Sequence, residues 1–500
     1  MKRWWFVTAV VVLSILVASI PSALLVQGSV AATAAAVTPA REEAFYPDKP
    51  LTHFAFGSCN KDDRPQPLWK PILDYQPDLW LWLGDIIYSD RPFWPLLLWR
   101  PGSEHSVKAQ YQRQKDQPDY AKLRNTTSIL GIWDDHDFGI NNGGKEFERR
   151  RESQRWLLEF LDERPDSPRW HREGLYASYT FGPKGKRAKL ILLDTRYFRD
   201  PPPLPHEYEE GLDHSSGESQ KDMLGEEQWR WLEREVIYPE EEEEEAPQVL
   251  ILASGVQVLP VDKTATESWG NYPTSRRRLL RLLRARSTTA KRGGAILLLS
   301  GDVHYAEMFR TRFPSSFATK NENEGEDQYT ASLLPQIYEV TSSGMTHCCA
   351  TQIPFGMCRR LLEGASRSEW QISDFYEHRN WGAVEIDWES VPPVVRMQVR
   401  TEHGTVALEH VIPFGEAEGE EAESRRRALV KAEEEEEEGE REVPAWRRWH
   451  QDIWLDYIRW GLIALFLAIA TAACWVLWKL FGVVRRTKKV ALTSTKKKVQ

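Results

Sequence analysis

The clearest indication of the fold is the stretch Leu79-Trp80-Leu81-Trp82-Leu83-Gly84-Asp85-Ile86-Ile87-Tyr88. Its first five apolar residues predict a strand, and the Gly-Asp pair that follows predicts a turn where this strand ends. Similar apolar runs, each followed by polar residues or glycine, predict further strands at His53–Phe56, Ile129–Trp133, Leu190–Leu193, Val249–Ala253, Ile296–Leu299 and Glu339–Thr341.

Stretches with helical character separate most of these predicted strands. They lie at Pro67–Tyr75, Val107–Arg124, Phe147–Leu161, Glu226–Val236 and Ser275–Arg286. The alternation of strands and helices indicates an α/β fold. Farther along, Trp381–Trp388 and Val394–His410 read as strands with no helix between them, which predicts an antiparallel continuation or the edge of a second sheet.

The composition limits the class of protein. The 500-residue chain is 41% hydrophobic, enough for one or two sizeable cores, and it has a net charge of −9. Much of this charge lies in the acidic tracts Glu240–Glu245 and Glu416–Glu442, whereas the last residues, 485–500, are basic. Because phosphate backbones attract Lys and Arg, the nearly neutral remainder argues against a nucleic-acid partner, and a nuclease ranks last among the functions.

The two ends of the chain predict a membrane protein. Residues 1–36 combine a basic start, an apolar run and an Ala-rich segment, which indicates a signal peptide or, because the run is long, a signal anchor. Residues 460–484 predict a single transmembrane helix, with a buried core helix as the alternative. Residues 44–414 are then a lumenal or extracellular domain, 415–450 an acidic stalk and 485–500 a basic cytosolic tail, in a type I protein of the secretory pathway.

Two short motifs agree with this topology. Lys497 and Lys498 stand fourth and third from the last residue and resemble a dilysine signal, read by sorting machinery, that retrieves proteins to the endoplasmic reticulum. The alternative is a basic tail that binds anionic lipid. Asn125 begins the sequon Asn125-Thr126-Thr127 and is a candidate glycosylation site.

The five cysteines fall in separate environments. Cys59 follows a predicted strand, and Cys474 lies in the predicted transmembrane helix. Cys348, Cys349 and Cys358 cluster in one segment. An oxidising lumen favours one disulfide there, joining either Cys348 or Cys349 to Cys358.

Four predicted strand ends carry side chains that bind metal ions. They are Cys59, Asp85 with Tyr88, the run Asp134-Asp135-His136-Asp137, and Asp302 with His304. Each of these residues alone is more often structural, but four clusters after four strands favour one shared site, because ligands bind at the carboxyl ends of strands in such sheets. Carboxylate, imidazole, phenolate and thiolate together suit Fe³⁺ or Zn²⁺ better than Mg²⁺ alone.

Five motifs, within roughly residues 50–410, resemble those of PhoD-like alkaline phosphatases and phosphodiesterases, a group of calcineurin-like metallophosphoesterases. In chain order they are Phe56-Gly57-Ser58-Cys59, Gly84-Asp85-Ile86-Ile87-Tyr88, Trp133-Asp134-Asp135-His136-Asp137-Phe138-Gly139, Leu193-Asp194-Thr195-Arg196 and Ser300-Gly301-Asp302-Val303-His304-Tyr305. The resemblance implies a β-sandwich flanked by helices and a metal-dependent hydrolase of phosphodiesters or phosphomonoesters, with diesters favoured. The alternative is a catalytically inactive lumenal receptor or scaffold on the same fold.

The resemblance also implies a role for each metal ligand. Asp85 resembles the carboxylate that bridges two ions, and Cys59, Tyr88 and His304 resemble the other ligands of a ferric site. Asp135 and Asp302 then hold the second ion, Ca²⁺ or another divalent ion, and Zn²⁺ is an alternative metal.

Three further residues resemble those that contact substrate. His136 corresponds to the general acid or a phosphate contact, Asn141 to a loop asparagine near the phosphate, and Arg196 to a phosphate clamp. Gln257 stands where the wider superfamily has a histidine. The predicted anchor places the site near a membrane, so we expect the phosphate-ester substrate to be a lipid or glycolipid.

Overall fold

The computed structural model describes residues 43–46, 49–93, 98–202, 221–238, 246–261, 263, 267–289, 292–311, 336–353, 356–365, 367–416 and 471. The predictions for residues 1–36, 460–484 and 485–500, and for nearly all of the stalk, concern residues outside these ranges, apart from Thr471. Within the described ranges, no helix has both the length and the apolar character that crossing a membrane requires.

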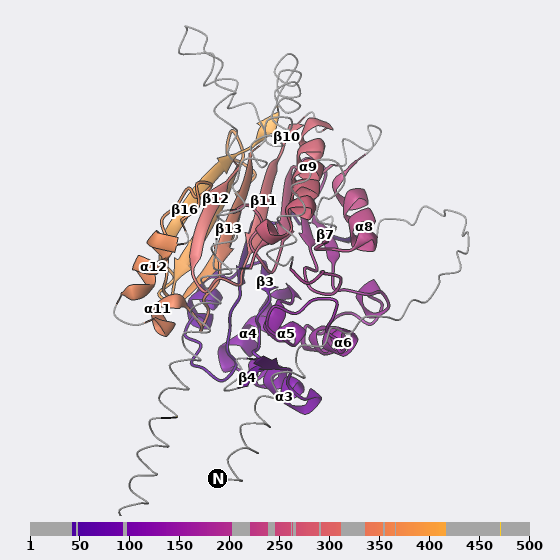
Figure 1. Cartoon of the computed structure of the whole chain (residues 1–500). Coiled ribbons are helices and arrows are strands. Elements are labelled where there is room, and N and C mark those ends of the chain that lie inside the picture. Colours follow the sequence, from indigo (N-terminus) through magenta and orange to yellow (C-terminus); the bar gives the residue numbers. More distant parts are fainter. Residues whose placement is uncertain are drawn as a thin grey trace, which may run out of the picture. The chain divides into compact units, whose positions relative to one another are not determined.

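Two large β-sheets form the centre of the fold (Figure 1). The first has seven strands in the order β1 (Glu43–Tyr46), β7 (Ala177–Phe181), β8 (Ala188–Leu192), β9 (Val249–Ala253), β11 (Ala295–Ser300), β13 (Ile337–Ser342) and β12 (Ala306–Arg310). Strands β8, β9, β11 and β13 run parallel to one another, so their carboxyl ends lie along one edge.

The second sheet has six strands. Their order is β16 (Val406–Pro413), β15 (Val394–Thr401), β14 (Asn380–Asp387), β2 (His53–Gly57), β3 (Leu79–Leu83) and β6 (Ser128–Ile132). Strands β2, β3 and β6 are parallel. Strand β14 pairs antiparallel with β2, and β15 and β16 extend the sheet with each strand antiparallel to the one before it, which confirms an antiparallel continuation. Two small antiparallel pairs, β4 (Arg91–Phe93) with β5 (Leu98–Arg100) and β10 (Arg292–Gly293) with β17 (Gly415–Glu416), complete the strands of the described residues.

Strand β3 shows why the two sheets stack. Successive side chains of a strand point to opposite faces. Leu79, Leu81 and Leu83 therefore enter the core between the sheets, while Trp80 and Trp82 pack on the outer face. Because both faces of β3 are buried, helices must cover the outer one.

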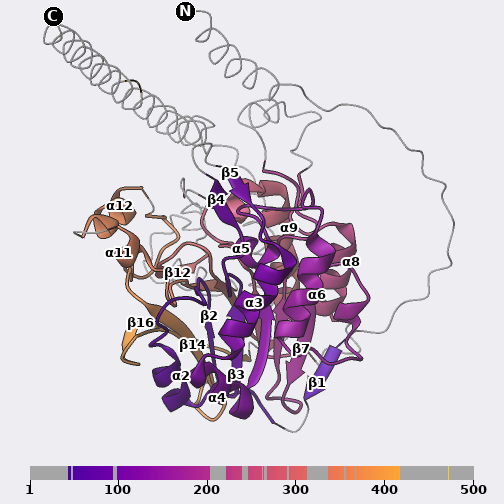
Figure 2. The ribbon, with the colours of Figure 1, turned by 90° about the horizontal axis from the view of Figure 1, so that it is seen from below.

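Helices cover the outer faces of both sheets (Figures 1 and 2). On the six-stranded sheet they are α2 (Trp69–Tyr75), α3 (Glu104–Lys115), α4 (Pro118–Thr126), α5 (Asp135–Phe138) and α6 (Arg150–Phe160). On the seven-stranded sheet they are α8 (Glu226–Val236) and α9 (Pro273–Thr289). Short helices α11 (Cys349–Gln352) and α12 (Met357–Ala365) follow β13, and 3₁₀ turns lie at Pro168–Trp170 and Trp269–Asn271. The predicted α/β class is confirmed, as sheets flanked by helices.

Two predicted elements are wrong in their extent. The helix predicted over 107–124 is two helices, because Pro118 lacks the N–H that would continue α3 and instead occupies the first turn of α4. The strand predicted over 394–410 is β15 and β16 joined by a turn, where Gly404 adopts a φ of 78° that favours glycine.

The structure also selects between the two disulfides left open by the sequence. Cys349 is bonded to Cys358, which links α11 to α12, and Cys348 is a buried free thiol. The backbone N–H of Cys349 donates to the carbonyl of His304 at 2.7 Å, so the linked segment lies against the loop that follows β11.

Candidate metal centre

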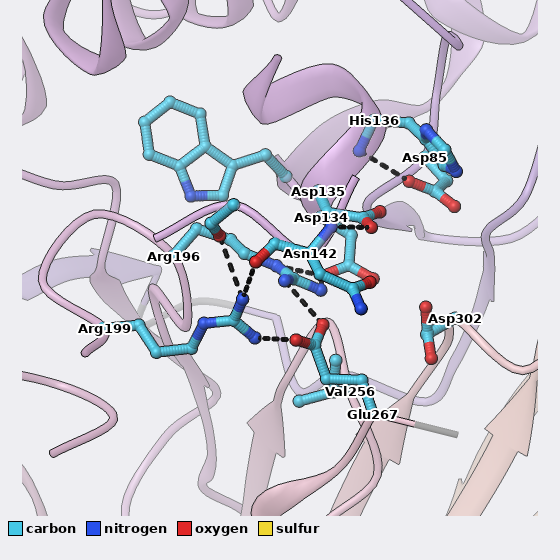
Figure 3. A network of polar contacts seen from close by, with 12 residues as sticks. Asp85, Asp134, Asp135, His136, Asn142, Arg196, Arg199, Val256, Glu267 and Asp302 are labelled. Carbon is cyan, nitrogen blue, oxygen red and sulfur yellow. Dashed lines mark hydrogen bonds and ion pairs between the residues drawn. The ribbon is translucent and has the colours of Figure 1, made fainter. Parts of the chain in front are cut away.

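The candidate site is built from loops that follow parallel strands of both sheets. Strands β2, β3 and β6 lead into Cys59, Asp85 and Asp134, and β11 leads into Asp302. Because the carboxyl ends of these strands lie at the same end of the two stacked sheets, residues more than 200 positions apart in the sequence meet there. Figure 3 shows several of these side chains converging.

The first group of candidate ligands consists of Cys59, Asp85 and His304, each with a ligand atom within 4.8 Å of the other two. The Tyr88 hydroxyl lies 3.1 Å from Oδ2 of Asp85 and 3.2 Å from Nε2 of His304. The hydroxyl of Ser343 lies 2.9 Å from Sγ of Cys59 and accepts a hydrogen bond from the His304 N–H. The structure thus brings together the four residues expected at a ferric site, and Ser343 holds two of them.

Two further groups share members with the first. Asp85, Asp135 and His136 form one, and Asp134, Asp135 and Asp302 form the other, again with ligand atoms within 4.8 Å. Asp85 and Asp135 each belong to two groups, as a carboxylate shared between two ions requires. Asp134 was not singled out as a ligand in the sequence, where it appears only as part of an acidic run.

The backbone is strained at four of these residues. Cys59, Asp85, Asp302 and His304 all adopt positive φ, at 59°, 52°, 71° and 64°. This left-handed region is uncommon for residues other than glycine and costs about 1–3 kcal/mol per residue. Such strain persists where the surrounding fold imposes it, and it clusters at functional sites. The conformation of these loops therefore points to a site rather than to ordinary turns.

Gly84 lets the two neighbouring loops approach closely. Its φ is 95°, and a Cβ at this position would lie 2.3 Å from the backbone nitrogen of Asp134. On the other side, a Cβ at Gly255 would lie 2.6 Å from Oδ1 of Asp134. Asp134 thus lies between two glycines that leave no room for a side chain, which positions its carboxylate.

The electrostatics fit cations at this site. Burial raises the pKa of the Cys59 thiol and of the Asp85 and Asp302 carboxyls well above their ordinary values. Oδ2 of Asp134 and Oδ1 of Asp135 are buried and accept no hydrogen bond within the described part of the chain. Buried carboxylate oxygens without partners are costly, and bound cations would compensate them. These residues therefore fit metal ions.

His136 belongs to a buried His–Asp pair. Its Nδ1 lies 2.6 Å from Oδ1 of Asp90, and the Asp90 side chain is completely buried. Burial lowers the pKa of His136, but the carboxylates of Asp135, Asp85 and Asp90 outweigh it and raise this pKa to about 10. The pair fixes the ring and leaves Nε2 as the nitrogen that can exchange a proton with a ligand.

Two loop residues, Asn141 and Asn142, extend this arrangement. The N–H of Asn141 donates to Oδ2 of Asp90 at 2.8 Å, and the N–H of Asn142 donates to Oδ2 of Asp135 at 2.7 Å. The bond from Asn142 and the charges of His136 and Arg196 lower the pKa of Asp135 to about 2 against the effect of burial. The loop thus acts through its backbone, and the expected phosphate contact of Asn141 stays a prediction.

Arg196 lies beneath the site and not at its surface. Its guanidinium is completely buried and contacts Oδ1 of Asp134 at 2.5 Å and Oε2 of Glu267 at 2.6 Å (Figure 3). Arg199 pairs with the other oxygen of Glu267. These contacts orient Asp134 and partly neutralise it. The phosphate clamp expected of Arg196 stays a prediction, since its charged groups face carboxylates here.

Two other residues from the motif analysis have structural contacts. Asp137 accepts hydrogen bonds from the N–H groups of Asp134 at 2.6 Å and Ile86 at 3.1 Å, so it ties the β6 loop to the β3 loop. Gln257 donates to Glu307 and to Thr341 in a buried polar network. It belongs to none of the candidate metal groups found among the described residues.

The remaining predicted sites are not near this centre. Asn125 is exposed in the last turn of α4, and its glycosylation stays a prediction. Lys497 and Lys498 lie outside the described residues. Sequence reasoning missed Asp90 and Glu267, because neither forms a local pattern and each meets its partner only in the folded chain. Ser343 could have been found from the sequence, because Ser342-Ser343-Gly344 directly follows a predicted strand.

A sandwich of two sheets, with three overlapping groups of anionic and imidazole side chains at the carboxyl ends of its strands, forms a candidate site for more than one metal ion. The comparison with known families identifies the chain more closely. The family model of the PhoD-like phosphatases matches residues 54–333, and the chain belongs to this family. No curated protein matches the sequence. Family membership together with the candidate metal groups indicates a metal-dependent phosphoesterase.

Proposed function

We propose that this protein hydrolyses phosphate esters by attack of a metal-activated water, and that residues 44–414 form its catalytic domain. The observation that carries the proposal is the overlap of three candidate ligand groups through Asp85 and Asp135. A pair of ions joined by shared carboxylates suits in-line displacement at phosphorus.

The ligands divide into two sets by their chemistry. Cys59, Tyr88 and His304, with Asp85, would hold Fe³⁺, because phenolate and carboxylate are hard anionic donors. Asp135 and Asp302, with Asp85, would hold Ca²⁺ or another divalent ion, and Zn²⁺ is the alternative metal. When bound, such ions lower the pKa of a coordinated water and neutralise charge on phosphoryl oxygens.

The chain's own residues would then move a proton and orient the ligands. His136, held at Nδ1 by Asp90, would donate a proton from Nε2 to the leaving oxygen. Arg196 would hold Asp134 in place and favour its charged form, because its charge opposes the burial that raises the pKa of Asp134 to about 7. Asn141 would contact the phosphate with its side chain, while its backbone N–H donates to Asp90.

The substrate side of the proposal concerns a membrane. We propose a single-pass type I protein, with residues 415–450 as stalk and 460–484 as anchor, that acts on a lipid or glycolipid phosphoester. The indole of Trp99 supports an apolar leaving group, because its ring lies 5.3 Å from that of His136 and is half-buried. Trp99 closes the run Phe93-Trp94-Pro95-Leu96-Leu97-Leu98-Trp99, which contains no polar side chain that could hold a hydrophilic group.

Localisation and processing complete the proposal. Lys497 and Lys498 would direct retrieval to the endoplasmic reticulum, and Asn125 would carry a glycan. Replacement of both lysines by serine, followed in cells by microscopy, tests the first, and a mass shift lost in Asn125→Gln tests the second.

The decisive experiment is Asp85→Ala in the full chain, purified with its metals. We expect loss of hydrolysis of p-nitrophenyl phosphate and of bis(p-nitrophenyl) phosphate, together with loss of bound metal in elemental analysis, because Asp85 joins both sites. Asp74→Ala, which removes an exposed carboxylate from an ion pair on α2, is the control and should leave both unchanged. Wild-type protein that binds no metal and hydrolyses neither ester would instead favour an inactive receptor or scaffold.

A further inference from the structure

The candidate centre is open to solvent at three of its residues. Cys59, Asp85 and Asp135 are buried, whereas Tyr88, Asp302 and His304 keep part of their surface exposed. Among the candidate ligands, these three are therefore the ones that a substrate can reach from solvent. Side chains that border them are the ones that meet the parts of the substrate not held by the ions.

Lys61 borders this open side. Its ammonium lies 4.6 Å from the centre of the Tyr88 ring, and its side chain is partly exposed. No carboxylate in the described part of the chain forms an ion pair with it, in contrast to Lys70, which pairs with Asp74. The backbone N–H of Lys61 donates a hydrogen bond to the Thr346 hydroxyl at 2.6 Å, which fixes the backbone at Lys61. Among the described residues, the Lys61 ammonium thus lies beside the candidate centre without an ion-pair partner.

His347 borders the same side from a different segment. Its ring lies 4.2 Å from that of His304 and 5.1 Å from that of Tyr88, and its N–H donates to the carbonyl of Cys59. The Nδ1 atom of His347 is buried and has no hydrogen-bond partner within the described residues. The family match ends at residue 333, so it does not include this side chain.

We infer that Lys61 and His347 form an anion-binding subsite that contacts a terminal phosphoryl oxygen of the substrate and makes the enzyme prefer phosphomonoesters. This inference rests on the proposed function. A monoester at neutral pH carries a charge of about −1.5 to −2 and three terminal oxygens. A diester carries one negative charge and has a carbon substituent on one of these oxygens. An unpaired ammonium therefore stabilises the monoester more strongly, because charge-assisted hydrogen bonds are the stronger ones.

The test uses two substrates with the same leaving group, p-nitrophenyl phosphate and bis(p-nitrophenyl) phosphate. We expect Lys61→Met in the metal-loaded full chain to lower kcat/KM for the monoester by about 10- to 100-fold, the usual loss of a charge-assisted hydrogen bond. For the diester we expect less than about a threefold change, since it lacks the third terminal oxygen. Lys61→Arg should keep most of the monoester activity, because it keeps the charge.

Further measurements make the inference specific. His347→Gln should lower monoester activity by about 3- to 10-fold, as expected for a neutral hydrogen bond. Lys70→Met, on the exposed surface of α2, is the matched control and should change neither substrate. Inorganic phosphate should inhibit Lys61→Met more weakly than wild type, by the same factor as the monoester loss. Bound metal should be unchanged.

Two results would overturn the inference. One is an equal loss on both esters in Lys61→Met, which would mean that Lys61 only supports the metal ligands. The other is unchanged inhibition by inorganic phosphate. If wild-type protein hydrolyses neither ester, the proposed function fails. Calorimetric titration of inorganic phosphate into the metal-loaded protein then decides on the subsite alone, since weaker binding by Lys61→Met supports it and equal binding refutes it.

Discussion

Asp90→Asn tests whether the buried His–Asp pair serves proton transfer. The substitution keeps the shape of the side chain and one acceptor oxygen, but it removes the negative charge that faces Nδ1 of His136 at 2.6 Å. Asp90 also accepts a hydrogen bond from the backbone N–H of Asn141. In Asp90→Asn this hydrogen bond is kept only if the amide oxygen of the new side chain turns toward Asn141. Asp90 is a positioning residue in this scheme, because it acts through His136.

The magnitude follows from the burial of the pair. A hydrogen bond between charged groups contributes about 1.5–3 kcal/mol, and both side chains here are almost fully shielded from water. At about 1.36 kcal/mol for each tenfold change in rate, we expect kcat to fall about 10- to 150-fold. The loss of the Asp90 charge also lowers the pKa of His136, so the proton needed for the leaving group is lost at lower pH.

The assay compares leaving groups of different quality. Phenyl phosphate, whose leaving oxygen needs a proton, should lose more of its kcat than p-nitrophenyl phosphate, whose leaving group departs as an anion. The alkaline limb of the pH–rate profile should move to lower pH. Asp119→Asn, at an exposed ion pair on α4, is the control.

An equal fall in kcat for both leaving groups, with an unmoved pH profile, would exclude a role of the His–Asp pair in proton transfer. It would show that Asp90 only stabilises the loop. Loss of bound metal in Asp90→Asn would lead to the same conclusion, because the variant removes no candidate ligand.

Three further outcomes are expected. Gly84→Ala should abolish metal binding and activity, measured by elemental analysis and turnover, because its Cβ would meet the backbone of Asp134 at 2.3 Å. Cys349→Ser with Cys358→Ser should lower the free energy of unfolding by about 2–3 kcal/mol in a denaturant titration, from the loss of a ten-residue closed loop. In metal-free protein, burial raises the pKa of Asp137 to about 8. The folded state then holds a proton that the unfolded state has released above pH ~4, so Tm should fall between pH 5 and 8.

Each of these predictions has a result that contradicts it. Gly185→Ala also places alanine at positive φ, but no atom lies within 4 Å of its Cβ, so it should lower the free energy of unfolding by only about 1 kcal/mol. Equal losses of metal and activity in Gly84→Ala and Gly185→Ala would mean that contact with the Asp134 backbone is not the cause. Cys348→Ser retains the disulfide and should change stability less than the double variant does. A constant or rising Tm between pH 5 and 8 in the presence of chelator would rule out the protonated carboxyl.

Much of the fold was predictable from local patterns. The strands around Leu81, Ile251 and Leu298 were found because buried strands read as apolar runs, whatever lies next to them. The break at Pro118 was also in the sequence, since proline cannot continue a helix, but helical periodicity on both sides concealed it. Strand β7, Ala177–Phe181, was missed because its polar residues interrupt the apolar pattern.

The candidate ligands were predictable for a related reason. Cys59, Asp85, Asp135 and Asp302 follow directly after strands, and parallel strands bring their carboxyl ends to one edge. By contrast, the surroundings of Arg196 were not predictable. A buried guanidinium between Asp134 and Glu267 has the same sequence signature as one that faces a phosphate, because only the packed structure decides which anion it meets.

The strands, the types of ligand and their position after the strands follow from local sequence, because apolar runs and turn residues act over a few neighbours. The pairs Asp90–His136 and Arg196–Glu267, and the position of Lys61 and His347 beside the centre, arise only in the folded chain. These contacts join residues from separate loops. Their energy depends on burial and distance, which exist only once both sheets have stacked.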